Sequence, residues 1–301
     1  MKKAQAGMTT SRQTKGYINS IIGSTSYGTN PLFALPMYAM GYGASSVLFF
    51  RYLFASLIYF LWLKFVKKIS LKITLKEAIP LFILGFMFSM SSITLFYAFN
   101  YIESGIACTI LFVYPVMVAV IMAVFFKEKI TLPIVGAIAL TSSGILFLYS
   151  GGGTGASINL FGTVLVLLSA LLCAIYMVGV KTIPSVKHIR GDKQTFYVTL
   201  FGITVYILST KFLTNLQVLN SPKAFFLALG LAVFPTIISL ETINISIKFI
   251  GSTKTAIIGA LEPLTATILG ILLFNESISL TKLIGMLLVF GGVFVIVNSK
   301  R

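Results

Sequence analysis

The chain contains an internal repeat in which equivalent residues lie 148 positions apart. Glu262-Pro263 begins an apolar run in the C-terminal copy, and Tyr114-Pro115 begins a similar run in the N-terminal copy. Matching pairs are Ile250 with Ile102, Ser252 with Ser104, Pro263 with Pro115, Phe274 with Phe126, Glu276 with Glu128, Ile278 with Ile130, Leu280 with Leu132 and, after a one-residue insertion, Gly285 with Gly136. Because a repeat this long covers about half of the protein, it predicts a molecule built from two similar halves.

Composition predicts an integral membrane protein. Hydrophobic residues make up 57% of the chain and charged residues only 10%, with a mean hydropathy of +0.99. A water-soluble domain has roughly 25% charged residues, so this chain has too little polar surface for a soluble fold. Cys108 and Cys173 both lie in apolar stretches, which does not indicate a disulfide framework.

Windows of about 20 residues predict ten membrane-spanning helices, which makes the chain all-α. The expected spans are Gly16–Ala39, Ser45–Trp62, Ala78–Ala98, Ser104–Phe126, Leu132–Tyr149, Leu160–Val180, Thr195–Ser209, Ala224–Ile247, Thr255–Phe274 and Lys282–Val297. A Gly- and Ser-rich linker at 151–159 separates five-helix repeats at 16–150 and 160–299. The polar tail at 1–15 is expected to be disordered, and no small-residue cleavage site ends the apolar run behind it, so we expect the first span to be retained.

The distribution of basic residues predicts the orientation, because short cytoplasmic loops collect Lys and Arg. With the N-terminus inside, 19 of the 23 Lys and Arg residues fall on the inner side and three on the outer side. We therefore expect a multi-pass protein of the cell membrane, plasma or inner, with both termini cytoplasmic. The net charge of +16 fits contact with anionic lipid headgroups at the cytoplasmic face. It does not indicate nucleic-acid binding, since the basic residues form no compact domain.

Five spans per repeat is an odd number, so the second copy enters the membrane from the opposite face. Such inverted repeats occur in many secondary transporters, where the substrate site lies near the midplane between the halves. The sequence therefore predicts ten transmembrane helices, arranged as two inverted five-helix repeats around a central cavity.

Four segments together resemble the EamA-type transporters of the drug/metabolite transporter superfamily, and the resemblance covers nearly the whole chain. They are Glu262-Pro263 leading into Phe274-Asn275-Glu276, Tyr114-Pro115 leading into Phe126-Lys127-Glu128, Ser26-Tyr27-Gly28-Thr29-Asn30-Pro31, and Phe50-Arg51-Tyr52. The resemblance implies a ten-helix bundle around a central cavity. It also implies a carrier of amino acids or other small metabolites that most often moves them outward.

Glu262 lies near the middle of the ninth span, where an ionisable group is costly unless it faces protein or water. Pro263 beside it cannot donate a hydrogen bond, so we expect a bend at which the carbonyl of Gly259 is unbonded. Glu262 then binds a proton, a cation or a substrate amine. The alternative is a buried structural Glu, kept neutral or bonded to a neighbouring helix.

Two further ionisable residues lie within the expected spans. Glu241, about one helical turn from Asn244, is a candidate for what distinguishes this protein from its relatives; the alternative is a side chain that reaches the cytoplasmic interface. Arg51 has the planar fork that binds carboxylates or phosphates, although snorkelling or a structural ion pair is the favoured interpretation.

Neutral polar groups complete the candidate site. Asn30, Tyr114 and Tyr176 are preferred, because amide and phenol groups in lipid need partners, and Ser26 and Tyr97 are further candidates. Small hydroxyl groups also serve helix packing in membranes, so part of this set is expected to be structural. The candidates for helix breaks or gating are Pro31, Pro115 and Pro263.

Secondary transport is the predicted function, either by facilitated diffusion or coupled to a proton or ion gradient. No cofactor, metal site or phosphate-binding loop is indicated, and the single His188 lies in a charged loop, so we do not expect an enzyme. The alternative is an intramembrane enzyme that acts on a lipid or lipid-linked substrate, with Glu241 and Glu262 as an acid/base pair. A channel is a weaker option. The sequence leaves open the substrate, the direction of transport, and whether the carrier works alone or as a homodimer.

Overall fold

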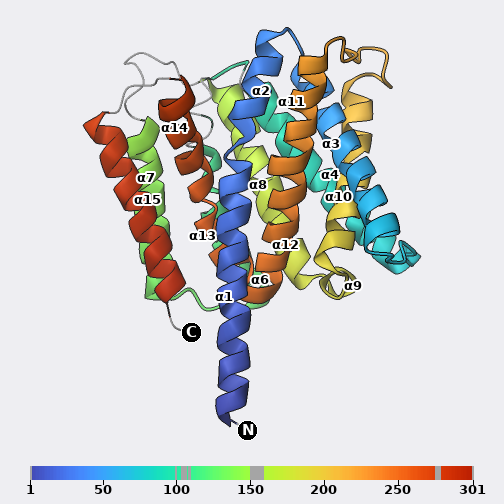
Figure 1. Cartoon of the computed structure of the whole chain (residues 1–301). Helices are drawn as coiled ribbons and strands as arrows, with labels where there is room; N and C mark the ends of the chain where they lie inside the picture. Colours follow the sequence, from blue (N-terminus) through green and yellow to red (C-terminus); the bar gives the residue numbers. More distant parts are fainter. Residues whose placement is uncertain are drawn as a thin grey trace.

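The computed structural model describes residues 2–98, 100–102, 107, 110–149, 159–274 and 279–299, and within these residues the protein contains helices and no strands (Figure 1). Most of the predicted linker, Cys108 and the segment 275–278 lie outside the described residues. The prediction of an all-helical protein is confirmed for the part that is described.

Helices occupy the described parts of all the expected spans. The first half contains α1 (Lys2–Tyr27), α2 (Asn30–Ala39), α3 (Ala44–Leu61), the π-helical turn η1 (Trp62–Val66), α4 (Leu75–Ala98), α6 (Tyr114–Phe126) and α7 (Leu132–Tyr149). The second half contains α8 (Leu160–Thr182), α9 (Pro184–Lys187), α10 (Gly191–Ser209), α11 (Pro222–Ala232), the π-helical turn η2 (Val233–Ile238), α12 (Ser239–Ile250), α13 (Ser252–Ile258), α14 (Leu261–Phe274) and α15 (Leu280–Asn298).

Six helical stretches of the described chain are long and apolar enough to cross a membrane. They are Ala44–Val66, Leu75–Ala98, Leu160–Thr182, Pro222–Ile250, Ser252–Leu273 and Leu280–Asn298. Large apolar side chains cover the outside of the bundle, as at Leu132 and Leu160, which are 84% and 78% exposed. A surface of this kind suits contact with lipid, so the chain is a multi-pass membrane protein.

Three local features differ from the predicted spans. The first span is divided, since α1 ends at Tyr27 and α2 begins at Asn30, and the ninth is divided between α13 and α14. The expectation of a disordered tail is wrong for the backbone, because α1 begins at Lys2. The residues of this tail have fair helix propensity, so the helix continues outward from the apolar part. The short helix α9 was not predicted.

Helix pairing follows the repeat. The first helix of each half packs against the third helix region of the other, so α1 contacts α12 and α8 contacts α4. The second helices, α3 and α10, pack together, as do the last helices, α7 and α15, which lie side by side in Figure 1. Equivalent helices therefore make equivalent contacts across the boundary between the halves.

Close packing of α7 on α15 is reciprocal at two glycines. A Cβ atom at Gly144 would lie 2.8 Å from the carbonyl oxygen of Gly285, and one at Gly292 would lie 2.9 Å from the carbonyl oxygen of Ala137. Both glycines and both carbonyls are 148 positions apart. The predicted one-residue insertion, which aligned Gly285 with Gly136, is therefore wrong here, since Gly285 occupies the place equivalent to Ala137.

Candidate functional site

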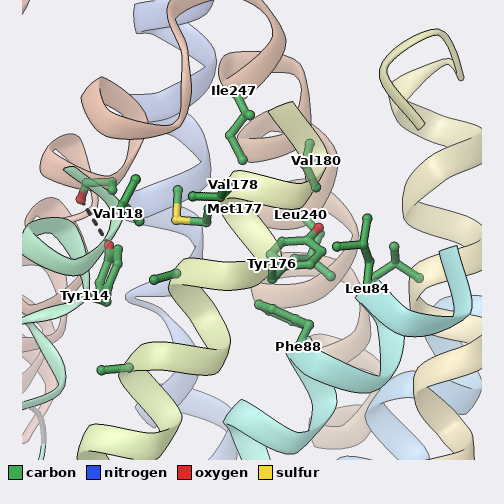
Figure 2. Close-up of a cluster of buried hydrophobic side chains, with 14 of the residues drawn as sticks. Leu84, Phe88, Tyr114, Val118, Tyr176, Met177, Val178, Val180, Leu240 and Ile247 are labelled. Atoms are coloured by element: carbon green, nitrogen blue, oxygen red, sulfur yellow. Dashed lines mark hydrogen bonds between the residues drawn. The ribbon is translucent and has the colours of Figure 1, made fainter. Parts of the chain in front are cut away.

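A cavity of about 100 Å³ lies where α1, α4, α6, α8, α12 and the α13–α14 break meet, so both halves of the chain contribute to it. Its polar, thiol and aromatic lining residues are Ser24, Tyr27, Phe88, Ser91, Ser92, Tyr114, Ser169, Cys173, Tyr176, Ser239, Thr255 and Glu262. Three of the predicted site residues, Tyr114, Tyr176 and Glu262, are thus brought together. Figure 2 shows Tyr114, Tyr176 and Phe88 on separate helices of this region.

Glu262 reaches the cavity from the first turn of α14, just after a break in the helix. The carbonyl oxygen of Gly259 accepts a hydrogen bond from the Glu262 N–H at 2.9 Å, so the expectation that this carbonyl is unbonded is wrong. Pro263 is the third residue of α14, where a backbone N–H has no partner within the helix. Pro31 and Pro115 also lie in the first turns of their helices, α2 and α6. The three prolines therefore begin helices at breaks and do not bend continuous ones.

The Glu262 carboxyl group makes no hydrogen bond or ion pair with the part of the chain that the structure describes. The helix break holds it close to α1. A Cβ atom at Gly28 would lie 2.5 Å from the Glu262 carbonyl oxygen and 2.6 Å from Thr265 Cβ. Only glycine allows this approach at position 28. The sequence therefore places a carboxyl group against the end of α1 without an ion-pair partner among the described residues.

The two tyrosines are fixed by hydrogen bonds to other helices. The Tyr114 hydroxyl group donates to the carbonyl oxygen of Ala256 on α13 at 3.1 Å. The Tyr176 hydroxyl group donates to Asn244 Oδ1 at 2.7 Å, and Asn244 Nδ2 donates to Thr195 Oγ1 at 3.0 Å. Asn244 is fully buried and was not predicted as a site residue, although an amide within a membrane span signals a need for partners.

Arg51 is buried and serves the fold. Its Nε donates to Thr236 Oγ1 at 2.5 Å and its Nη2 donates to the carbonyl oxygen of Pro235 at 2.9 Å. Pro235 cannot donate to the carbonyl oxygen of Leu231, which instead accepts from the Thr236 hydroxyl group at 2.8 Å. The Arg51 side chain therefore stabilises the π-helical turn η2. Its Nη1 also lies 3.4 Å from Asn30 Oδ1, so Asn30 pairs with Arg51 and does not line the cavity.

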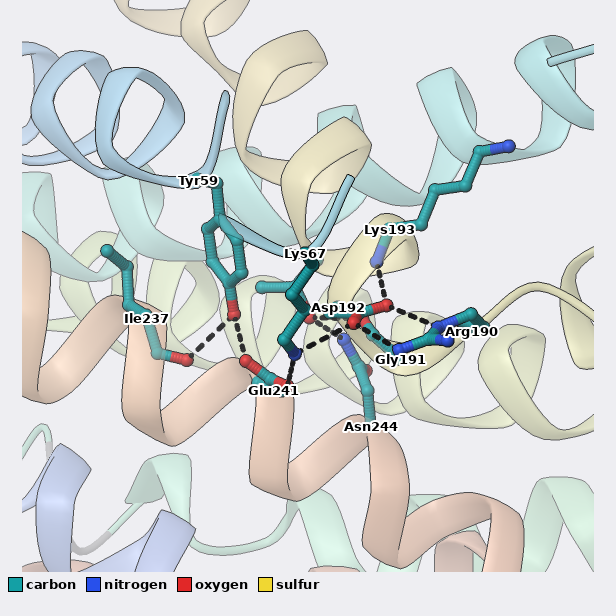
Figure 3. Close-up of polar contacts among 10 residues, drawn as sticks. Tyr59, Lys67, Arg190, Gly191, Asp192, Lys193, Ile237, Glu241 and Asn244 are labelled. Atoms are coloured by element: carbon teal, nitrogen blue, oxygen red, sulfur yellow. Dashed lines mark hydrogen bonds and ion pairs between the residues drawn. The ribbon is translucent and has the colours of Figure 1, made fainter. Parts of the chain in front are cut away.

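Glu241 lies outside the cavity, in a separate charged cluster (Figure 3). The Tyr59 hydroxyl group donates to Glu241 Oε2 at 2.8 Å, and Lys67 Nζ lies 3.9 Å from Glu241 Oε1. Lys67 Nζ also donates to Asp192 Oδ2 at 3.0 Å, as does Arg190 Nη2 at the same distance. This cluster ties α3 and η1 to α10 and α12.

Asp192 precedes the predicted span 195–209 and is 4% exposed. Burial raises the pKa of this carboxyl group, but hydrogen bonds from Arg190, Lys67 and the Lys193 N–H outweigh burial and hold the pKa below its usual range. The Asp192 carboxylate therefore stays charged and holds the cluster together.

The remaining predicted residues also lie outside the cavity. The Ser26 hydroxyl group donates to the carbonyl oxygen of Phe234 at 2.7 Å, which ties α1 to η2. Tyr97 is 47% exposed and lines a different pocket of about 360 Å³, formed by the start of α3, the end of α4 and the segment after α10. Neither residue contributes to the cavity around Glu262.

The model of the EamA-like transporter family matches residues 14–150 and again residues 160–298. The chain belongs to the EamA-like transporter family. The two matches coincide closely with the two halves inferred from the repeat.

Two curated relatives of this EamA-like chain are transporters by name. An uncharacterized transporter of Archaeoglobus fulgidus is 25% identical over 193 residues, which cover 64% of this chain and 67% of the relative. The uncharacterized transporter YetK of Bacillus subtilis is 24% identical over 260 residues, which cover 83% of this chain and 77% of YetK. A solved crystal structure is similar with a TM-score of 0.79, over 94% of this chain and 96% of the other. At 15% identity that likeness shows the fold alone.

Proposed function

We propose that this EamA-like protein is a secondary transporter that moves small metabolites, such as amino acids, outward across the cell membrane. The cavity that contains Glu262 is its substrate site, and alternating access exposes that site to one face of the membrane at a time. The observation that carries this proposal is the composition of the cavity wall, which includes helices from both halves and a single carboxyl group.

Alternating access needs two conformations of similar energy, and inverted repeats supply them because each half can adopt the conformation of the other. Equivalent pairings across the halves, α1 with α12 and α8 with α4, support such a pseudo-two-fold arrangement. The reciprocal contacts of Gly144 and Gly292 support it at the level of single residues. We infer ten membrane spans, five in each half, and opposite orientations of the two halves in the membrane.

The distribution of basic residues supports one orientation of the protein in the membrane. The beginning of α1, the end of α15 and α9 lie toward the same end of the molecule (Figure 1). That end carries the inner set of basic residues, so we place it and both termini at the cytoplasmic face, against anionic headgroups.

Glu262 is the group through which a gradient could drive transport, since it binds a proton or a cation without breaking a protein contact. The enzyme alternative needed Glu241 and Glu262 to act as a pair. Glu241 is bonded to Tyr59 and Lys67 outside the cavity, so no observation favours that alternative.

The test is uptake and counterflow in proteoliposomes that contain only the purified full-length chain. A mixed set of labelled amino acids, nucleosides and amines is offered with and without a pH gradient. Saturable uptake that is accelerated by unlabelled solute inside the vesicles is expected for at least one class. The absence of any movement, in vesicles shown to hold folded protein, would contradict the proposal.

A further inference from the structure

We propose that the cavity binds small organic cations that carry no carboxylate group, with Glu262 as their counter-ion and tyrosine rings as the surrounding wall. This inference rests on the proposed transport function. It narrows the substrate from small metabolites, amino acids included, to monovalent amines and quaternary ammonium compounds.

The cavity carries a single negative charge. Glu262 is the one charged residue among those that line it, and its carboxyl group has no hydrogen bond or ion pair within the described chain. A carboxylate away from bulk water is costly unless a cation accompanies it. Among the described residues that line the cavity there is no Lys, Arg or His. The buried Arg51 guanidinium attracts Glu262 only at longer range, without an ion pair, so the cation that contacts the carboxylate has to come from the ligand or be a proton.

The cavity offers no positively charged group to a zwitterion. An amino acid would also bring a carboxylate group, which needs a cation or several N–H donors. Arg51 is a buried residue that could in principle pair with a ligand carboxylate. Its Nε, Nη1 and Nη2, however, are directed at Thr236, Asn30 and Pro235. It does not line the cavity. A bound amino acid would therefore leave its carboxylate group without a charged partner.

The aromatic wall favours a cation. Tyr27, Phe88, Tyr114 and Tyr176 all line the cavity, and the rings of Phe88 and Tyr176 have centroids 4.8 Å apart. The faces of aromatic rings attract ammonium groups, especially where water is excluded. Tyr27 already has this role toward the protein, since Arg51 Cζ lies 5.4 Å from the centroid of its ring.

A free polar group completes the site. Ser24 lines the cavity and is 2% exposed, and its hydroxyl oxygen has no hydrogen-bond partner among the described residues. This hydroxyl group could accept a hydrogen bond from a primary ammonium group, or pair with a hydroxyl group of the ligand. It offers no charge, so it would not compensate a ligand carboxylate.

The repeat limits the charge of the ligand to one. The position equivalent to Glu262 in the first half is Tyr114, which lines the same cavity with a phenol group. A pair of symmetry-related acids would favour a divalent cation or two amines. One acid and one phenol favour a single positive charge.

Choline and betaine provide a matched pair of probes, because both have a trimethylammonium group and only betaine has a carboxylate group. Equilibrium binding of each labelled probe is measured on the purified full-length chain, on Glu262→Gln and on Glu128→Gln. Glu128 is a carboxylate outside the cavity and serves as the control. Choline is expected to bind about 10-fold or more tightly than betaine, and Glu262→Gln is expected to weaken choline binding by about 30-fold. Glu128→Gln should bind choline as the unmodified protein does.

Tyr27 gives a second test that does not depend on the folding of Glu262→Gln. Tyr27→Phe keeps the ring and should retain choline binding, whereas Tyr27→Leu should weaken it by about 5-fold or more. Equal weakening of choline binding in both variants would show that the Tyr27 ring does not contribute to binding.

Three results would overturn the inference: no choline binding, betaine binding that equals choline binding, or choline binding that folded Glu262→Gln retains. Vesicle counterflow separates this failure from failure of the proposed function. Counterflow of amino acids without choline binding would support the transport function and contradict the proposed cation site. Choline binding without movement of any solute would support the cation site and contradict the transport function.

Discussion

Tyr114 and Glu262 occupy equivalent positions of the two repeats and line the same cavity from the first turns of α6 and α14. Each is followed by a proline that begins its helix after a break. The duplication thus brings two side chains to one place. One is a hydrogen-bonded phenol, and the other is a carboxyl group that has no hydrogen bond or ion pair with the described residues. The chemical asymmetry of the site comes from this one pair.

Asn244 is expected to hold Tyr176 in place at the cavity wall. Asn244→Leu removes the acceptor of the Tyr176 hydroxyl group and should lower the free energy of unfolding by about 1–3 kcal/mol, because a buried donor loses its partner. Denaturation of the purified protein in detergent measures this. In a double-mutant cycle, Tyr176→Phe should cost less in the Asn244→Leu background than alone. Strictly additive effects would mean that the two side chains are not coupled.

Gly292 and its neighbour Gly291 provide a matched pair for testing the packing of α7 on α15. A Cβ atom at Gly292 would lie 2.5 Å from Thr141 Cγ2 and 2.9 Å from the Ala137 carbonyl oxygen, whereas a Cβ atom at Gly291 would meet no described residue within 4 Å. Gly292→Ala should therefore destabilise the protein by about 1–3 kcal/mol through overpacking. Gly291→Ala should be neutral, or stabilising by up to about 1 kcal/mol from helix propensity. Equal thermal stability of the two variants would show that the helices do not approach so closely.

Asp192 predicts a specific dependence of stability on pH. Its pKa is lowered in the folded protein, so its contribution is present in full above the unfolded pKa of about 3.9 and is lost as the pH falls through the folded value. The unmodified protein should lose stability below about pH 4 relative to Asp192→Asn. Thermal unfolding of both proteins between pH 3 and pH 7 measures the difference. Parallel curves over this range would show that the pKa of Asp192 does not change on folding.

Arg51→Lys tests whether the guanidinium group is structural. Lysine cannot bond both Thr236 and Pro235 with a planar fork, so η2 should lose about 1–3 kcal/mol of stabilisation. The folded fraction should keep its preference for choline over betaine, because Arg51 does not line the cavity. Arg12→Lys, at an exposed position, is the control for stability. A changed preference in folded Arg51→Lys would make Arg51 part of the substrate site.

The sequence predicted the broad fold because the features that determine it are local or repeated. Apolar segments of helix length gave the helices, and the 148-residue offset gave the two halves. Helix breaks were predicted at Pro31 and Pro263, but the close packing at Gly28 and Gly259 was not predicted. A Cβ atom at Gly28 would lie 2.5 Å from the Glu262 carbonyl oxygen, and a Cβ atom at Gly259 would clash with the Tyr114 hydroxyl group. Both close approaches involve helices that are distant in sequence.

The candidate site was predicted in part for the same reason. Glu262, Tyr114 and Tyr176 were identified because polar groups in apolar spans need partners or a cavity. That rule does not distinguish a residue bonded to a protein partner from a residue that faces a cavity. Glu241 contacts Tyr59 and Lys67, and Arg51 donates a hydrogen bond to η2. The spacing of residues in the sequence does not predict these contacts.

In the proposed mechanism, the cavity between the halves opens to each side of the membrane in turn. Sided labelling of Ser24→Cys tests it, in a chain whose two native cysteines are replaced by alanine. Ser24 lines the cavity, whereas Ser89 is buried outside it, so Ser89→Cys is the control. A membrane-impermeant maleimide should label Ser24→Cys when applied from either face of the vesicle, excess transported solute should slow the labelling, and Ser89→Cys should not react. Labelling of Ser24→Cys from one face only, under every solute condition, would contradict alternating access at this cavity.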